Sequence, residues 1–442
     1  MITTEELHKY INAHLRQQRR IFSQSAYFRG PHPAIYADSA KEDPDNRVPV
    51  TIPRKAVKFL NGYMFKPGSI VYTGDYYENV LKDQFNACEE SILTSELAVS
   101  ALIHGHAYEL HWTDGGKDYF AEVPIEQSIM VYDDKLGIFS EPVYFIRYWT
   151  DDDGVQRAEV WDATEKQSFT GPQWQIDGPA MVHGYRRVPV IDFKIARDGS
   201  NLFDHVLPLV DVLDKGMSED VANELQRLAN SYLLLANDID ATPGADGESE
   251  VDKIKRTKII ANLREDVTRS VAFLTKNLDP SFINSALDRI ERLCYELIGI
   301  PNPSDDTFAA SSGIALLYKL VPLEFTSSDI ETYFSRGLQQ RIRLMANLDA
   351  TINGDSDSTE VSIQFHRNLP MDILSLAQTA GMLKGILSDE TILKMFPASL
   401  VPDVEEELER LNNVMDIESV EDESPDEEEP EEEPAEAVNA ES

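Results

Sequence analysis

The sequence predicts an α+β protein that is mainly helical and elongated. Three observations support this prediction. Long stretches carry apolar residues at helical spacing, whereas residues 106–193 alternate as strands do. The 442-residue chain is 42% hydrophobic, which is enough material for a core. A helix covering 202–237 would be roughly 50 Å long, and such a rod suits an assembly better than a compact globule.

The net charge of the chain is −38, from 78 acidic and 40 basic residues. A chain this acidic would not hold nucleic acid by releasing counterions, although it could surround DNA without binding it tightly. Two cysteines, Cys88 and Cys294, are too few for a disulfide framework or a cysteine zinc site, and we expect them in the core. We expect no membrane span and no secretory signal.

The N-terminal part should be helical. Thr3 followed by Glu6 matches a capping box, and the helix that starts there should stop before the Gly-Pro segment at 30–33. An extended, turn-rich segment should follow over 41–74, interrupted by a short helix around 54–64. Helical spacing returns over 76–104.

An antiparallel β module should occupy about 106–193. A hairpin turn is expected at Asp114-Gly115-Gly116, because Gly tolerates the positive φ angles of tight hairpins. Strands are expected at 143–149 and 157–162 on either side of a second turn, and residues 188–193 should close the module.

The C-terminal half should return to helices. Residues 202–237 carry one broad apolar stripe that Gly216 is expected to bend. Further elements are expected in this order: a polar loop at 240–252, a strand-like basic segment at 253–276, helices at 280–298 and at 314–347 with a kink at Pro322, a strand at 355–365, and helices to about 413. The acidic tail beyond them should be disordered.

No catalytic motif is present in the sequence. His104 and His106 lack a third ligand at metal-site spacing, so we interpret them as ordinary turn or edge histidines. The acidic run 151–153 is interpreted as a solvated hairpin tip. Asp305 and Asp306 are interpreted as helix-capping or surface residues. The residues alone therefore indicate a structural or assembly protein without a metal or cofactor.

A basic segment stands out within the acidic chain. Residues 253–276 contain seven bases and two acids, Glu265 and Asp266. Such a strip could bind an acidic partner, or it could be a solvated strand surface.

Four passages in collinear order, between about residues 20 and 412, form a recognisable set. They are Tyr27-Phe28-Arg29-Gly30 with 44–50 and 62–67; 188–193 ahead of a long helix; 299–308 with 311–316; and 363–370 with 387–393 and 403–407. Together they resemble the portal protein (head-to-tail connector) family of tailed bacteriophages, in particular the siphophage portals of Gram-positive hosts. Residues 51–53 and 309–310 depart from the family pattern.

The resemblance implies a ring of identical subunits, usually twelve, at one capsid vertex. DNA would be packaged and ejected through the ring. The subunit would be divided as follows: wing 1–201, stem helices 202–238 and 280–299, clip 239–279, tunnel loop 300–313, a long kinked wing helix and strand 314–368, crown helices 369–413, and a disordered acidic tail 414–442.

The resemblance also implies three groups of functional residues. The tunnel loop would line the channel with Pro301, Asn302, Pro303, Ser304, Asp305, Asp306, Thr307, Phe308, Ser311, Ser312 and Gly313. The clip would contact the packaging motor and the adaptor through Lys253, Lys255, Arg256 and Lys258. On the long helix, Arg336, Arg341 and Arg343 would touch DNA phosphates or pair with acids of a neighbouring subunit.

The implied partners are further copies of the chain, the terminase large subunit, a head-completion adaptor, the major capsid and scaffolding proteins, and double-stranded DNA in the channel. The implied location is the virion, with assembly in the host cytoplasm, and no enzymatic activity. Two alternatives remain open at this point. One is a metal-dependent nuclease that uses clustered acids, and the other is a capsid or scaffold protein of another kind.

Overall fold

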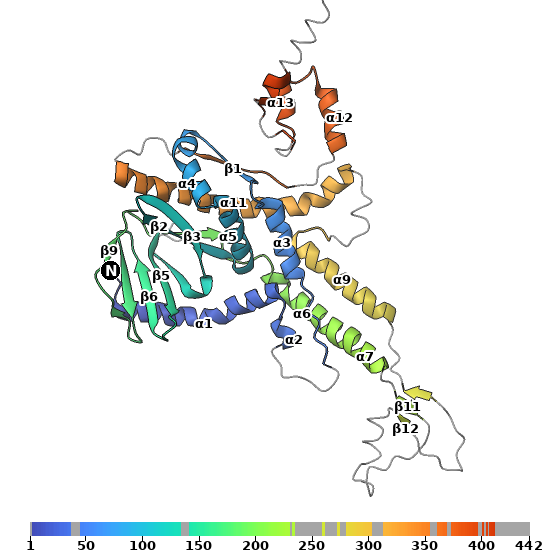
Figure 1. Ribbon diagram of the computed structural model, residues 1–442. Helices are drawn as coiled ribbons and strands as arrows, with labels where there is room; N and C mark the ends of the chain where they lie inside the picture. The colour runs from blue at the N-terminus through green and yellow to red at the C-terminus, as the bar shows by residue number, and fades with distance from the viewer. Residues whose placement is uncertain are drawn as a thin grey trace, which may run out of the picture. The chain divides into compact units, whose positions relative to one another are not determined.

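The computed structural model describes residues 2–36, 45–133, 141–229, 232–234, 259–260, 272–274, 280–302, 313–353, 360–368, 373–396, 400–401, 404 and 406–411. The chain divides into two units, residues 1–368 and residues 369–442. Helices and strands are mixed along the first unit, which confirms the predicted α+β class (Figure 1).

The first helix, α1 (Thr4–Arg29), begins and ends where the sequence predicts. The Thr3 hydroxyl accepts the Glu6 N–H and the Glu6 carboxylate accepts the Thr3 N–H, so the capping box is confirmed. Gly30 ends the helix with a φ of 122°, a conformation that favours glycine. Two further helices follow, α2 (Pro33–Tyr36) and α3 (Ile52–Met64).

The region predicted as helix over 76–104 forms three pieces. They are η1, a π-helix (Tyr77–Leu81), α4 (Lys82–Ala87) and α5 (Glu90–His104). The break lies at Glu89, whose φ is 52°, because a residue in the left-handed region interrupts the helical hydrogen-bond ladder. Leu97, Ala98, Ala101 and Leu102 of α5 are fully buried, so this helix is part of the core.

The predicted β module is confirmed, but it forms two sheets. The smaller sheet has the order β10-β2-β3, with β2 (His106–Asp114), β3 (Lys117–Val123) and β10 (Val190–Lys194) all antiparallel. Asp114 pairs with Lys117 across the hairpin. Gly115 and Gly116 have φ angles of 57° and 80°, as a two-residue turn with two positive φ angles requires.

The larger sheet has the order β4-β5-β6-β7-β8, and β9 also pairs with β7. Its strands are β4 (Ser128–Tyr132), β5 (Pro142–Thr150), β6 (Gln156–Trp161), β7 (Glu165–Thr170), β8 (Gln175–Ile176) and β9 (Met181–Val182). Helix α1 lies along the module, where Leu7 and Ile11 pack against Ile146 and Val160 (Figure 1).

The helix predicted over 202–237 is confirmed only in part. It consists of a 3-10 turn η4 (Asp204–Val206), α6 (Leu207–Lys215), a π-helix η5 (Gly216–Asn223) and α7 (Glu224–Ala229). The prediction is wrong at its C-terminal end, where Tyr232–Leu234 forms the strand β11. This strand pairs with β12 (Ile259–Ile260) and β13 (Ala272–Leu274), so strand partners from a distant segment replace the helix.

The extended segment before α3 is bound to this helical region through backbone N–H groups. Val50 donates to Asp214 Oδ1 at 2.7 Å, Val48 donates to Ser218 Oγ at 3.0 Å, and Asn46 donates to Asn223 Oδ1 at 2.7 Å. Polar side chains buried on the helix therefore take the place of a partner strand.

The remaining helices of the first unit are α9 (Pro280–Ile298) and α11 (Gly313–Asn353). Pro322 lies within α11, which continues on both sides of it. Strand β14 (Ser362–Phe365) pairs with β1 (Ile70–Thr73). The second unit contains α12 (Ile373–Leu383) and α13 (Asp389–Leu393). Within the described ranges, no helix is both long enough and apolar enough to cross a membrane.

Candidate assembly site

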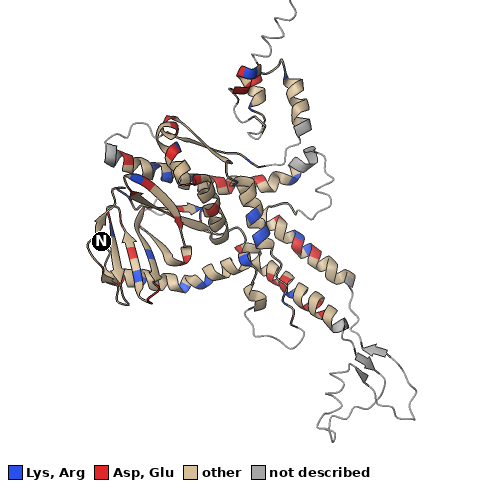
Figure 2. Ribbon diagram, in the orientation of Figure 1, with Lys and Arg blue, Asp and Glu red and all other residues tan. Residues whose placement is uncertain are grey.

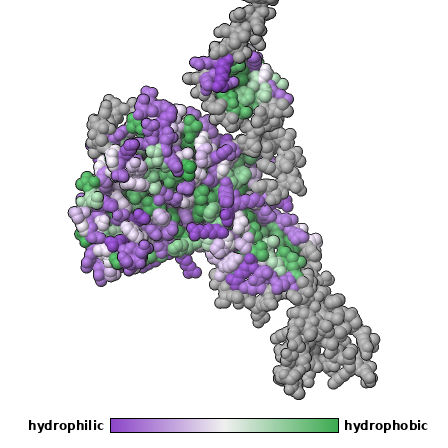
Figure 3. Space-filling model, viewed as in Figure 1, coloured by the Kyte–Doolittle hydropathy of each residue, from purple (hydrophilic) through white to green (hydrophobic). Residues whose placement is uncertain are grey.

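Helix α9 has apolar side chains on two sides. Cys294, Tyr295 and Ile298 are buried against the rest of the chain. Phe282, Leu293 and Leu297, at spacings of eleven and four residues, share a different face and are 71%, 36% and 55% exposed. Hydrophobic colour gathers over this helix in Figure 3. A soluble helix normally keeps a single apolar stripe toward its core, so the second stripe is a candidate contact surface.

The first half of α11 repeats this pattern. Leu320, Leu323, Ile330 and Phe334 are buried. The opposite face carries Tyr318, Val321 and Phe325 at positions i, i+3 and i+7, and these are 75%, 39% and 71% exposed. We call the six exposed residues of the two helices the outward faces of α9 and α11.

Helices α6 and α9 approach each other closely at Gly216. A Cβ atom at this position would lie 2.7 Å from Leu287 Cδ2. Gly216 is also the first residue of η5. The predicted bend at Gly216 stays a prediction. The structure shows instead that π geometry begins at this residue, where the close approach of Leu287 leaves room only for a small side chain.

The connection that leaves α9 is held against α11. Gly299 has a φ of 78°, and a Cβ atom there would lie 2.3 Å from Thr326 Oγ1. Ile300 is buried. Pro301 and Asn302 are partly buried, and they are the last residues described before Gly313. The base of this connection is therefore fixed by packing on α11.

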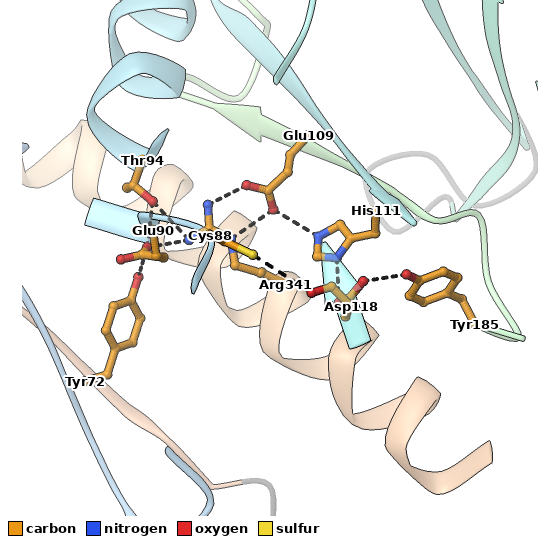
Figure 4. A network of polar contacts seen from close by, with 9 residues as sticks. All are labelled: Tyr72, Cys88, Glu90, Thr94, Glu109, His111, Asp118, Tyr185 and Arg341. Carbon is orange, nitrogen blue, oxygen red and sulfur yellow. Dashed lines mark hydrogen bonds and ion pairs between the residues drawn. The ribbon is translucent and has the colours of Figure 1, made fainter. Parts of the chain in front are cut away.

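A network of buried charges joins the second half of α11 to the sheet (Figure 4). Arg341, which is fully buried, forms a two-pronged ion pair with Glu109 of β2: Nε donates to Oε1 at 2.9 Å and Nη2 to Oε2 at 2.6 Å. Its Nη1 donates to Glu90 Oε1 of α5 at 2.5 Å. The guanidinium also lies 4.9 Å from the centroid of the Phe120 ring and 5.1 Å from that of Phe193.

The network continues across the sheet through His111. Its Nε2 lies 3.0 Å from Glu109 Oε1 and its Nδ1 lies 2.9 Å from Asp118 Oδ2. Tyr185 donates its hydroxyl to Asp118, so one chain of contacts extends from α11 to the segment before β10. Every charge in this network is thus paired within one chain.

Burial and ion pairing act against each other on the pKa values of this network. For Glu109, burial alone would raise the pKa, but Arg341 and His111 lower it to about 2. For His111, burial alone would lower the pKa, but Asp118 and Glu109 raise it to about 9. Both groups are therefore charged at neutral pH.

The expectation for Arg341 is wrong. The prediction places it against DNA or a neighbouring subunit, yet Arg341 is fully buried and paired inside its own chain. Its neighbours Leu344 and Met345 are buried with it, while Arg336 and Arg343 are exposed. The sequence did not predict this network. Glu109 and His111 alternate with apolar residues along β2, and this pattern normally indicates that the polar face is exposed to solvent, whereas both residues are buried.

The chain was compared with models of known protein families. A family model described as phage portal protein, SPP1 Gp6-like, matches residues 7–414. The chain belongs to this family. It is therefore a tailed-phage portal protein, and this family is a family of structural proteins of the virion capsid. No curated protein matches it closely enough to be counted as a relative.

Most predicted tunnel-loop and clip residues of this portal chain lie outside the described residues. These are Pro303, Ser304, Asp305, Asp306, Thr307, Phe308, Ser311, Ser312, Lys253, Lys255, Arg256 and Lys258. Gly313 is described only as the first residue of α11.

The remaining predicted residues of the portal chain have local partners. His104 Nδ1 lies 3.3 Å from Gln24 Oε1, and His106 Nδ1 lies 3.6 Å from Asp192 Oδ1. Asp151 Oδ1 accepts the N–H groups of Asp153 and Val155, as an acidic turn residue does. Within the described part of the chain, no group of three His, Cys, Asp or Glu could hold a metal ion.

Proposed function

We propose that copies of this portal chain associate side by side into a closed ring, and that double-stranded DNA passes through its opening during packaging and ejection. One observation carries the proposal: α9 and the first half of α11 have apolar residues on one face packed within the chain and on another face exposed. Identical copies related by rotation would cover the exposed faces with one repeated contact. The resemblance implies twelve subunits.

Charge supports the passage of DNA. Acidic residues are spread over α9 and α11 (Figure 2), and the chain carries a net charge of −38. An acidic channel wall would repel phosphates, and salt would screen that repulsion within about 8 Å. DNA would then slide without deep binding minima. Arg336 and Arg343 would contact phosphates or acids of the next subunit.

The remaining parts follow the proposed division into wing, stem, clip and crown. Residues 300–313 would form the tunnel loop at the narrowest part of the channel. The clip, 239–279, would bind the terminase large subunit and later the head-completion adaptor through its positive strip, because complementary charge steers such encounters. Capsid and scaffolding proteins would meet the ring at the capsid vertex.

Negative-stain imaging of the purified protein, together with DNA packaging by phage particles, tests the channel. We expect rings with a central opening. Deletion of Ser304–Ala310 should leave the rings intact and produce heads without DNA. Isolated globules at micromolar concentration, or normal packaging by the deletion variant, would refute the ring or the tunnel loop respectively.

Charge reversal tests the clip. Changing Lys253, Lys255, Arg256 and Lys258 to Glu should weaken terminase binding in a pull-down or calorimetric assay. The matched control reverses four exposed bases of the proposed wing, namely Lys9, Arg19, Lys58 and Lys66. Equal binding by the two variants would contradict the assignment of the clip.

A further inference from the structure

A cavity of about 780 Å³ lies between α1, the junction of α5 with β2, β4 and the end of β10. This volume is typical of small-molecule sites. Four basic side chains line it: Arg16 and Arg20 from α1, and Lys194 and Arg197 from β10 and the segment after it. In a chain with a net charge of −38, such a concentration of positive charge is unusual.

Two acids also line the cavity, and neighbouring groups already engage them. Asp192 accepts the Tyr132 hydroxyl and lies 3.2 Å from Lys194 Nζ. Asp198 accepts the N–H of Ser200 at 3.0 Å and its hydroxyl at 2.7 Å. Both carboxylates stay charged, because the pKa of each is lowered, and Asp198 also attracts Arg20. The four bases of the lining therefore exceed its two acids by two charges.

The arginines differ in whether they have a partner. Arg20 pairs with Asp204 at 2.8 Å, outside the cavity lining. Among the described residues, neither Arg16 nor Arg197 makes a hydrogen bond or ion pair. Both are exposed, so they stand at the opening of the cavity. Arg16 and Arg20 are also four residues apart on one helix, where like charges repel each other.

Two of the histidines that line the cavity, His14 and His104, are neutral. Burial, and next the nearby His106, lower the pKa of both His14 and His104 to about 4. At neutral pH these imidazoles are uncharged and make hydrogen bonds, His14 with Tyr148 and His104 with Gln24. These two imidazoles therefore add no positive charge. Among the described residues, the cationic side chains of the lining that have no partner are Arg16 and Arg197.

We propose that this cavity binds a doubly charged phosphate group. The cationic side chains come from two separate walls, the α1 wall and the β10 wall. The several oxygens of a phosphate can accept hydrogen bonds from both walls at once, whereas one guanidinium fork saturates a planar carboxylate. The phosphate could belong to a free ion such as pyrophosphate or to the terminus of a nucleic-acid strand.

Isothermal titration of the full-length protein with pyrophosphate tests the proposal. We expect saturable binding that weakens as salt increases. Arg16→Glu/Arg197→Glu should bind at least about tenfold more weakly, because charge-assisted hydrogen bonds are lost and replaced by repulsion. Arg19→Glu is the control, since Arg19 is exposed on the same helix but does not line the cavity.

Two further ligands distinguish the sources of the phosphate. If a short oligonucleotide binds only when its 5′ end is phosphorylated, the site takes a strand terminus. If pyrophosphate binds and both oligonucleotides do not, it takes the free ion. The proposal is overturned if pyrophosphate gives no saturable binding, if citrate binds in its place, or if Arg19→Glu weakens binding as much as the double variant.

Discussion

The two halves of helix α11 differ in how their side chains are satisfied: the second half buries a charge that is paired within the chain, and the first half exposes apolar side chains. Its second half carries Arg341, whose charge is satisfied entirely by Glu90 and Glu109 of the same chain. Its first half leaves Tyr318 and Phe325 more than two-thirds exposed, on the side opposite its buried residues. In the second half, all interactions of Arg341 lie within a single chain. The first half has exposed apolar side chains that a second molecule could contact.

The difference follows from how much an unpaired buried charge and an exposed apolar side chain each destabilise the folded subunit. A buried charge without a partner would destabilise the fold by several kcal/mol, so it must be paired before any assembly takes place. Exposed aromatic side chains reduce the stability of an isolated subunit only slightly, so they can remain exposed until a second molecule binds. Charge thus fixes the helix within its subunit, and apolar surface remains available for association.

The largest expected effect comes from breaking the buried network. Arg341→Ala should reduce the free energy of unfolding by about 3–5 kcal/mol, because it leaves the buried Glu90 without its cation and Glu109 with His111 alone. Denaturant unfolding followed by circular dichroism measures the change.

The matched control is Arg343→Ala, two residues farther along the same helix at an exposed position. It should change stability by less than about 0.5 kcal/mol. Similar losses in the two variants would show that burial of Arg341 does not distinguish these arginines.

The outward faces provide the second comparison. Phe282→Asp/Phe325→Asp should weaken subunit association by roughly 10²- to 10⁴-fold while leaving the folded subunit intact. Each change removes about 1.5–3 kcal/mol of apolar burial from the contact, or about 3–6 kcal/mol for the two together. Analytical ultracentrifugation over a concentration series measures it.

Asn284→Asp is the control for added charge. Asn284 is exposed on α9, two residues from Phe282 and therefore on another side of the helix. Unchanged association of the double variant would remove the outward faces of α9 and α11 from the interface.

Close packing of α11 on β10 gives a smaller effect. A Cβ atom at Gly337 would lie 2.5 Å from Cδ1 of the buried Phe193 ring. Gly337→Ala should therefore destabilise the fold by about 1–3 kcal/mol. Gly62→Ala, in α3 where nothing lies within 4 Å, should instead be neutral or stabilising by up to about 1 kcal/mol. Thermal unfolding that gave both variants the same sign would contradict the packing argument.

The pH dependence should show the smallest effect. His111 is held by Glu109 and Asp118, and its folded pKa of about 9 lies above its ordinary value of 6.5. Its stabilising contribution is therefore complete below pH 6.5 and is lost as the pH rises toward 9. Between pH 6.5 and 8 the loss should be about 1–2 kcal/mol. His111→Gln should flatten this part of the stability profile, and an unchanged slope would place the titration elsewhere.

The sequence predicted individual elements well wherever the signal was local. The capping box of Thr3 and Glu6, the Gly115-Gly116 hairpin and the bounds of α9 depend on neighbouring residues, and each is confirmed. Family membership was also accessible, because collinear passages preserve order along the chain. The end of the helix after Ala229 was missed, since β11 forms with strands far along the sequence.

By itself, then, the sequence determined the class of fold, most of its helices and strands, and the portal family. Only the tertiary structure decided which charged residues face inward. Arg341 and Arg343 are the same residue type on one helix, and one is buried while the other is exposed. The physical reason is that a side chain's environment is set by which segments pack around it. Glu90, Glu109 and Arg341 come from three elements that only the folded chain brings together.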